Sequence, residues 1–268
     1  MDLEDLDSWE QFIKRVEEIK AARDAVAQDV KPVGVSKFLF RGQSNADWNL
    51  LTTLERVGSQ PWSFSKYFKL IRRARSQIET FTGKRWDKEA INELVEWGES
   101  YDNLWRDIPA YDYLVFLRHH GFPSPLLDWS RSPFVSAYFA FADASSERVA
   151  IYAYLEYAGK GKSGSSDEAQ IVSLGPFITS HSRHFLQQSE YTFAARYEQR
   201  CMFACHEDVF DYNRQDQDRL WKFTLPASER VKVLRTLEEY NLTSYSLFQT
   251  DESLMRTIAI KEIDLRHD

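Results

Sequence analysis

The sequence predicts an α+β protein built as a single domain around a central sheet that is mixed or mostly antiparallel. Three observations lead to this prediction. A block of helices lies near the N-terminus, strand patterns interspersed with helices occupy the second half, and no long linker divides the 268 residues. The one Gly- and Ser-rich stretch, residues 159–167, is short and is predicted to be a flexible surface loop.

The chain begins with a predicted helix and a predicted strand. Residues 8–29 carry apolar side chains at helical spacing, which makes residues 1–35 an N-terminal helical unit and residues 36–268 the core. Residues 36–40 are apolar and predict a strand. We expect this strand to deliver three residues at its end: Arg41, Gly42 and Gln43.

Helices come next, and strands follow them. Helical periodicity covers residues 63–81 and 87–119, with a break at Pro109, and a Ser-Pro pair starts another helix at residue 132. Strands are predicted for residues 149–155, 191–205 and 219–225, and a last helix for residues 253–263. Residues 231–234 fit either a strand or the start of a helix.

Composition restricts the class of protein. The net charge of −7 argues against a surface that coats nucleic acid. Cys201 and Cys205 are too few for a disulfide scaffold. Their spacing could hold a metal, but His206 is the one further candidate ligand, so we predict core packing and no metal site. The N-terminus lacks the pattern of a secretory signal, and no apolar run is long enough to cross a membrane. We therefore expect a soluble, cytoplasmic protein without a membrane partner.

Arg41 and the two residues after it form the first segment that can carry chemistry. A guanidinium at the end of a strand can bind a phosphate or a carboxylate through two parallel hydrogen bonds. Gly42, which has no side chain, would let a ligand approach the backbone. The alternative is an arginine in an ordinary surface turn.

Residues 119–133 form the second segment, which ends where a helix begins. It contains five candidate site residues, namely His119, Asp128, Trp129, Ser130 and Ser132. The free N–H groups at a helix N-terminus favour an anion. The alternative is that Asp128 and Ser132 only cap the helix while Trp129 packs against it.

Residues 182–193 form the third segment. Gln187, Gln188 and Glu190 precede an aromatic strand pattern, and a carboxylate there could stabilise a cationic transition state. The alternative is a polar turn that leads into the strand.

Together these segments resemble the FRG domain, which is named for a Phe-Arg-Gly motif. Residues 40–43, Phe-Arg-Gly-Gln, match that motif, and residues 119–130 resemble the second family block, which continues into residues 132–140. One position departs from the family pattern, because Pro125 stands where the family often has Arg. If the family arginine binds a phosphate, this chain either lacks that contact or supplies it from another residue, such as Arg131 or Arg183.

A second resemblance, to the Arg-Ser-Glu class of ADP-ribosyltransferases, implies a chemistry and an ADP-ribosyltransferase-like sheet. On this resemblance Arg41 would clamp NAD as co-substrate, and Ser130 or Ser132 would support its nicotinamide end beside Trp129. Glu190 would stabilise the oxocarbenium ion as nicotinamide leaves. The remaining contacts to the cofactor would come from Gly42, Gln43, His119, Gln187 and Gln188.

These resemblances imply a bacterial, NAD-using ADP-ribosyltransferase-like enzyme or NAD glycohydrolase. Such an enzyme would act as a toxin or phage-defence effector on a macromolecular acceptor, protein or nucleic acid, under an antitoxin or another regulatory partner. Two alternatives remain open. One is a non-catalytic module that binds a nucleotide or phosphorylated ligand, and the other is a hydrolase that uses Asp128 as its acid with His119.

Overall fold

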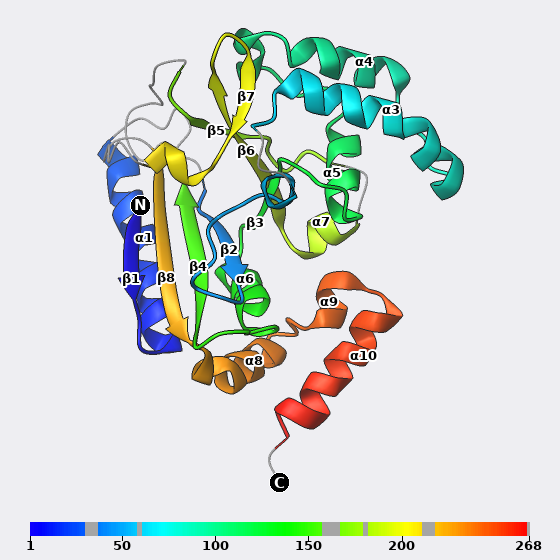
Figure 1. Cartoon of the computed structure of the whole chain (residues 1–268). Coiled ribbons are helices and arrows are strands. Elements are labelled where there is room, and N and C mark those ends of the chain that lie inside the picture. The colour runs from blue at the N-terminus through cyan, green and yellow to red at the C-terminus, as the bar shows by residue number, and fades with distance from the viewer. Residues whose placement is uncertain (30–36, 58–60, 157–166, 179–181, 211–217, 267–268) are drawn as a thin grey trace.

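In the computed structural model of the chain, the described residues form one sheet of eight strands, and helices pack on it (Figure 1). The structure describes residues 1–29, 37–57, 61–156, 167–178, 182–210 and 218–266. The strands are β1 Asp2–Asp5, β2 Leu39–Gln43, β3 Leu127–Ser130, β4 Arg148–Leu155, β5 Gln170–Ser173, β6 Ser189–Tyr197, β7 Cys201–Ala204 and β8 Arg219–Pro226. Their order is β1-β8-β4-β2-β3-β6-β5, with β7 against β6.

Among the strand pairs of the described residues, β1 and β8 are paired in parallel and the others are antiparallel. The predicted α+β fold with a mixed, mostly antiparallel sheet is therefore confirmed. The α-helices are α1 Trp9–Asp29, α2 Thr53–Arg56, α3 Phe64–Thr82, α4 Lys88–Trp97, α5 Tyr111–His119, α6 Pro133–Phe141, α7 Ser182–Leu186, α8 Arg230–Glu239, α9 Ser244–Phe248 and α10 Asp251–Ala259. Among the described residues, no helix is both long and apolar enough for a transmembrane span.

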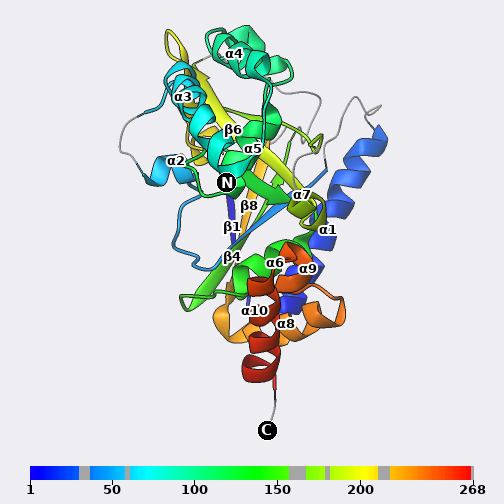
Figure 2. The same cartoon turned by 90° about the vertical axis from the view of Figure 1, so that its right-hand side faces the viewer.

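The core is divided because strand residues alternate between the two faces of the sheet. Phe40, Ile151 and Phe223 face α1 and α6 in one apolar cluster. Leu39 and Tyr152, their neighbours along the strands, belong to a second cluster on the other face. A third cluster joins α3, α4 and α5 to β6 and β7. Figure 2 shows these three helices gathered at one end of the molecule, while α8, α9 and α10 lie at the other.

Strand β1 was not predicted, because it consists of three acidic residues and one exposed leucine and therefore has no apolar pattern. Polar contacts place it at the edge of the sheet instead. Asp2 pairs with Arg219, and Glu4 receives two hydrogen bonds from Arg15 of α1. The N-terminal unit is therefore a strand followed by a helix, not a helix alone.

Strand β3 was not predicted, because residues 119–133 were described only as a segment that ends where a helix begins. Leu127–Ser130 is a central strand, paired with β6 and bridged to β2. Four residues with polar side chains at alternate positions give too short a pattern to be recognised. Arg41 to Gln43 likewise lie within β2, not after its end.

The other elements follow the sequence patterns closely. Ser132 caps α6 by accepting a hydrogen bond from Val135 N–H, and residues 231–234 lie in helix α8. Of the predicted loop 159–167, residues 159–166 lie outside the described residues, as does residue 36 at the predicted start of β2.

Candidate functional site

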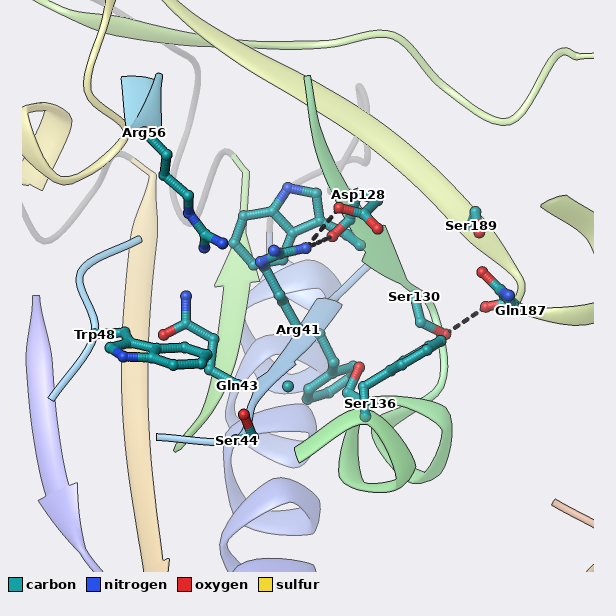
Figure 3. Close-up of a pocket in the computed structure, with 14 residues that line it drawn as sticks. Arg41, Gln43, Ser44, Trp48, Arg56, Asp128, Ser130, Ser136, Gln187 and Ser189 are labelled. Carbon is teal, nitrogen blue, oxygen red and sulfur yellow. Dashed lines mark hydrogen bonds and ion pairs between the residues drawn. The ribbon is translucent and has the colours of Figure 1, made fainter. Parts of the chain in front are cut away.

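The sheet opens between β2 and β3. Strand β2 pairs with β4 over its whole length and β3 pairs with β6, but the two strands share a single bridge pair, Phe40 with Ser130. A cavity of about 230 Å³ lies at this opening (Figure 3). Residues of β2, β3, α6 and the segments that follow β2 line it.

One carboxylate and three guanidinium groups dominate the electrostatics of the cavity. Arg41 Nη1 donates to Asp128 Oδ1 at 2.6 Å and to the Asp128 backbone oxygen at 2.8 Å. Arg118, at the end of α5, donates to the same Oδ1 at 2.6 Å. Arg56 projects from α2 toward the space beside this pair (Figure 3). Within the described residues its guanidinium has no hydrogen bond or ion pair.

The pKa values of Asp128 and Arg56 reflect the close spacing of these charged groups. Burial would raise the pKa of Asp128, but the charges of Arg118 and Arg41 outweigh burial and hold that pKa below its usual range. Burial lowers the pKa of Arg56, and the like charges of Arg41 and Arg118 lower it further. Positive charge therefore exceeds negative charge around the cavity, and Asp128 is an anionic partner of arginines.

The wall formed by β3 and α7 is closed by its own hydrogen bonds. Ser130 Oγ donates to the Gln187 backbone oxygen at 2.7 Å and accepts from Ser132 N–H at 3.0 Å. The Gln187 amide donates to the Leu247 backbone oxygen of α9 at 3.1 Å. Both residues line the cavity, and both are held by the protein itself.

A polar network lies behind Arg41. Trp129 Nε1 donates to Thr192 Oγ1 at 2.8 Å, and His206 Nε2 lies 2.9 Å from the same oxygen. His206 is fully buried, and burial with the charge of Arg41 lowers its pKa to about 3. The imidazole is therefore neutral at physiological pH.

Six of the predicted site residues are brought together with Arg41. The cavity is lined by Gly42, Gln43, Asp128, Trp129, Ser130 and Gln187 as well as by Arg41 itself. The segments singled out by their sequence motifs thus meet at one place, although residues far apart in the chain contribute to it.

Four other predicted residues do not line this cavity. His119 bonds the Tyr191 hydroxyl, and Ser132 caps α6. Gln188 is an exposed turn residue with φ of 48°. Glu190 lies next to Ser189, which lines the cavity, so its side chain projects from the opposite face of β6. There it pairs with Arg131 at 3.6 Å, and burial raises its pKa.

Sequence reasoning missed four residues that matter here: Arg56, Arg118, Ser136 and Trp48 as a cavity residue. Arg118 immediately precedes the recognised His-His-Gly block, which was the available signal. Arg56 lies outside the three segments, and only tertiary packing brings it here. The proposed substitutes for an arginine at Pro125 are elsewhere, because Arg131 pairs with Glu190 and Arg183 lies over the Phe248 ring.

The packing of α6 on β2 requires glycine at position 42, in addition to the ligand approach inferred from the sequence. A Cβ at this position would lie 1.9 Å from the backbone oxygen of Ser136 and 2.7 Å from the backbone nitrogen of Ala140. Helix α6 can therefore pack on β2 only because residue 42 has no side chain.

The geometry defines an α+β protein with an arginine-rich cavity where its sheet opens. Residues 36–148 match the model of the FRG domain, and this part of the chain is an FRG domain. The matched span includes Arg41, Arg56, Arg118 and Asp128, so the whole charged cluster belongs to the domain. No curated protein and no solved structure matches the chain. The resemblance to ADP-ribosyltransferases stays a prediction.

Proposed function

We propose that the chain binds a nucleotide, and that the arginine cluster holds the phosphate groups of that ligand. The observation that carries the proposal is the excess of positive charge at the cavity. Arg41 and Arg118 share one carboxylate, Asp128, while the guanidinium of Arg56 has no described partner. A phosphate would neutralise this charge and accept paired hydrogen bonds from Arg56.

The size and the rim of the cavity support a nucleotide over a free phosphate ion. A volume of about 230 Å³ exceeds the needs of phosphate alone but is smaller than the roughly 300–1,000 Å³ of sites that enclose a whole ligand. The sugar and phosphate would fill it, and a planar base would lie outside. Trp48 is 45% exposed at the rim and offers a ring on which a base can stack.

Cleavage of NAD is the second candidate, because Arg41 and Ser130 line the same cavity, as the Arg-Ser-Glu resemblance requires. The carboxylate expected from that resemblance, Glu190, lies on the other face of its strand. Transfer of ADP-ribose from NAD would therefore require Glu190 to move into the cavity or another acid to replace it. The roles that follow from such a transferase depend on the same condition: a macromolecular acceptor, an antitoxin, and action as a toxin or phage-defence effector. The hydrolase alternative gains no support, since Asp128 is held as a carboxylate and His119 bonds Tyr191.

Calorimetric titration with pyrophosphate, ADP-ribose and NAD tests nucleotide binding. We expect binding in all three cases and a loss of at least roughly tenfold in affinity for Arg56→Gln, because one charge-assisted contact is removed. Arg72→Gln removes an exposed arginine of α3 and is the matched control. Equal affinities of Arg56→Gln and Arg72→Gln would contradict the proposal.

Nicotinamide release from NAD tests the second candidate in the same samples. Release that is lost in Arg41→Ala and in Glu190→Gln, with NAD binding retained in Glu190→Gln, would support the transferase chemistry. Binding of NAD without release of nicotinamide, in the presence of candidate protein and nucleic-acid acceptors, would contradict the transferase chemistry and support nucleotide binding only.

A further inference from the structure

Positive charge is concentrated in residues 63–88, although the chain as a whole is acidic. This segment covers helix α3 and the turn to α4, and it contains eight lysines and arginines but only two acids, Glu79 and Asp87. The net charge of the whole chain is −7. A local excess of positive charge gives one part of the surface a field opposite in sign to the rest, and a polyanion is favoured there.

The basic residues of α3 lie on its solvent side, at the outside of the helical end of the molecule (Figure 1). The apolar stripe of the helix, which includes Phe64, Tyr67 and Ile71, is buried against α4 and α5. Glu79, the one acid of α3, is buried as well. The solvent side therefore has a basic face with no acid, made of Lys66, Lys69, Arg72 and Arg73.

Two cations of the basic face are free to bind a ligand. Helix α4 and the residue after it carry several acids, and one of these, Glu99, pairs with Lys69 at 3.4 Å. Within the parts of the chain that the structure describes, the guanidinium groups of Arg72 and Arg73 have no hydrogen bond or ion pair. Exposed guanidinium groups bind phosphate oxygens through paired hydrogen bonds, and no ion pair of the protein has to break first.

An aromatic ring lies at the end of the basic face. Phe81, in the last turn of α3, is 83% exposed. It follows Gln77 by four residues and Arg73 by eight, so these three side chains succeed one another along the solvent side of the helix. Proteins that bind single strands of nucleic acid combine cations, which contact the phosphates, with exposed rings on which the bases stack.

The same composition argues against two other anionic partners. An anionic membrane surface would need several apolar side chains to insert, and Phe81 is the one large apolar residue of α3 that is exposed. An acidic protein segment would use the cations, but its carboxylates offer no planar surface to the ring. The bases of a nucleic acid supply that surface.

We propose that the basic face of α3 and Phe81 bind a single strand of nucleic acid. The phosphates lie along the cations, and a base stacks on Phe81. From Lys66 to Phe81 the helix spans about 22 Å at a rise of about 1.5 Å per residue, which is long enough for several nucleotides. This inference does not rest on the proposed function, because none of these residues lines the cavity with Arg41 and Arg56.

Fluorescence anisotropy of the full chain with a short, labelled, single-stranded RNA of mixed sequence tests the proposal. At low salt, the double variant Arg72→Gln/Arg73→Gln should bind the RNA at least roughly tenfold more weakly than the wild type. Its slope of log affinity against log salt should be smaller by about 1.4, because each phosphate contact of a single strand contributes about 0.7. Phe81→Ser should weaken binding at least roughly fivefold and leave the slope unchanged, because a stacked base is lost and a charge is not.

Lys14→Gln/Lys261→Gln is the matched control. It removes two exposed lysines from other parts of the chain and changes the net charge by the same amount. We expect it to bind the RNA as the wild type does. Equal losses in the two double variants would overturn the proposal, because net charge and not the basic face would then govern binding.

Three further outcomes would also overturn the proposal. The first is absence of RNA binding by the wild type at low salt. The second is loss of RNA binding in Arg56→Gln with full binding in Arg72→Gln/Arg73→Gln, which would place the strand at the cavity. The third is binding of a polyglutamate peptide or of phosphatidylserine vesicles as tightly as RNA, with no effect of Phe81→Ser, which would assign the basic face to an acidic protein or to a membrane surface.

Discussion

Glu79 and Asp128 each lie against two arginines, yet their surroundings differ. Glu79, in α3, is buried and lies 3.5 Å from both Arg75 and Arg85. It also accepts the Trp86 backbone N–H at 3.1 Å, and Arg75 in turn donates to the Trp86 backbone oxygen. These contacts close the turn between α3 and α4.

The Asp128 cluster is not closed in this way. A third arginine, Arg56, faces the same cavity, and its guanidinium has no partner among the described residues. The same combination of charged residues thus serves two purposes. Where the protein itself satisfies each group, the cluster holds two helices together, and where it leaves an arginine unpaired beside a cavity, the cluster is suited to a ligand.

Glu79→Ala should have the largest effect on stability. Removing the acid of a buried ion pair costs roughly 3–5 kcal/mol, because its partners lose their compensation. Arg85 is 75% exposed and recovers hydration, so we expect a loss of about 2–3 kcal/mol in the free energy of unfolding. Chemical denaturation measures the loss, and nucleotide affinity should not change.

Arg85→Ala is the control for this prediction, with an expected loss below about 0.5 kcal/mol. A loss below about 1 kcal/mol for Glu79→Ala, or a weakened affinity for ADP-ribose, would break the distinction between the two clusters.

The stability of the protein should depend on pH through His206, which belongs to the polar network with Trp129 and Thr192 behind Arg41. The folded-state pKa of His206 is about 3, below its ordinary value of 6.5, so the unfolded chain binds a proton between these values and the folded chain does not. The contribution is fully present above pH 6.5 and decreases as pH falls. At pH 5 we expect a loss of about 2 kcal/mol relative to pH 7, from about 1.4 kcal/mol per pH unit.

His206→Gln removes this titrating group and should reduce the slope of unfolding free energy against pH between pH 5 and pH 7. Part of the slope should remain, because burial also lowers the pKa of His184. The Glu79 cluster has no histidine, so Glu79→Ala should lower that curve without changing its slope in this interval. Curves of equal slope for wild type and His206→Gln would show that folding does not lower the pKa of His206.

The sequence allowed the prediction of elements whose pattern is long and local. Strand β4 is apolar from Val149 to Leu155, and α6 begins after a Ser-Pro pair, so each was recognised from its own residues. Strand β3 was not, because Leu127–Ser130 is held in the sheet by neighbours on both sides and not by its own pattern.

The candidate site shows the same limit. Arg41 and Asp128 were identified because they lie in motifs, whereas Arg56 reaches the cavity only through the packing of α2. The position of Glu190 depended on which face of β6 its side chain occupies. One residue of register decides that face, and the polar residues at the start of β6 gave no apolar alternation to fix it.

Asp128→Asn should have a smaller effect on stability than Glu79→Ala, and it should strengthen ligand binding instead of leaving it unchanged. The amide keeps the size of the side chain and an acceptor for Arg41 or Arg118, and the side chain is 36% exposed, so the loss in unfolding free energy should be about 1 kcal/mol. The arginines lose the negative charge that competes with a ligand phosphate. Affinity for pyrophosphate should therefore rise roughly tenfold, as measured by calorimetry.

Glu79→Gln is the matched change in the closed cluster and should leave the affinity for pyrophosphate as it is in the wild type. If Asp128→Asn instead abolished binding, Asp128 would be a group that contacts the ligand directly, and the arginines alone would not make the site. If it bound pyrophosphate with unchanged affinity, the charge around the cavity would not govern binding. Only tighter binding in Asp128→Asn, with no change in Glu79→Gln, fits a carboxylate that balances arginines until a phosphate arrives.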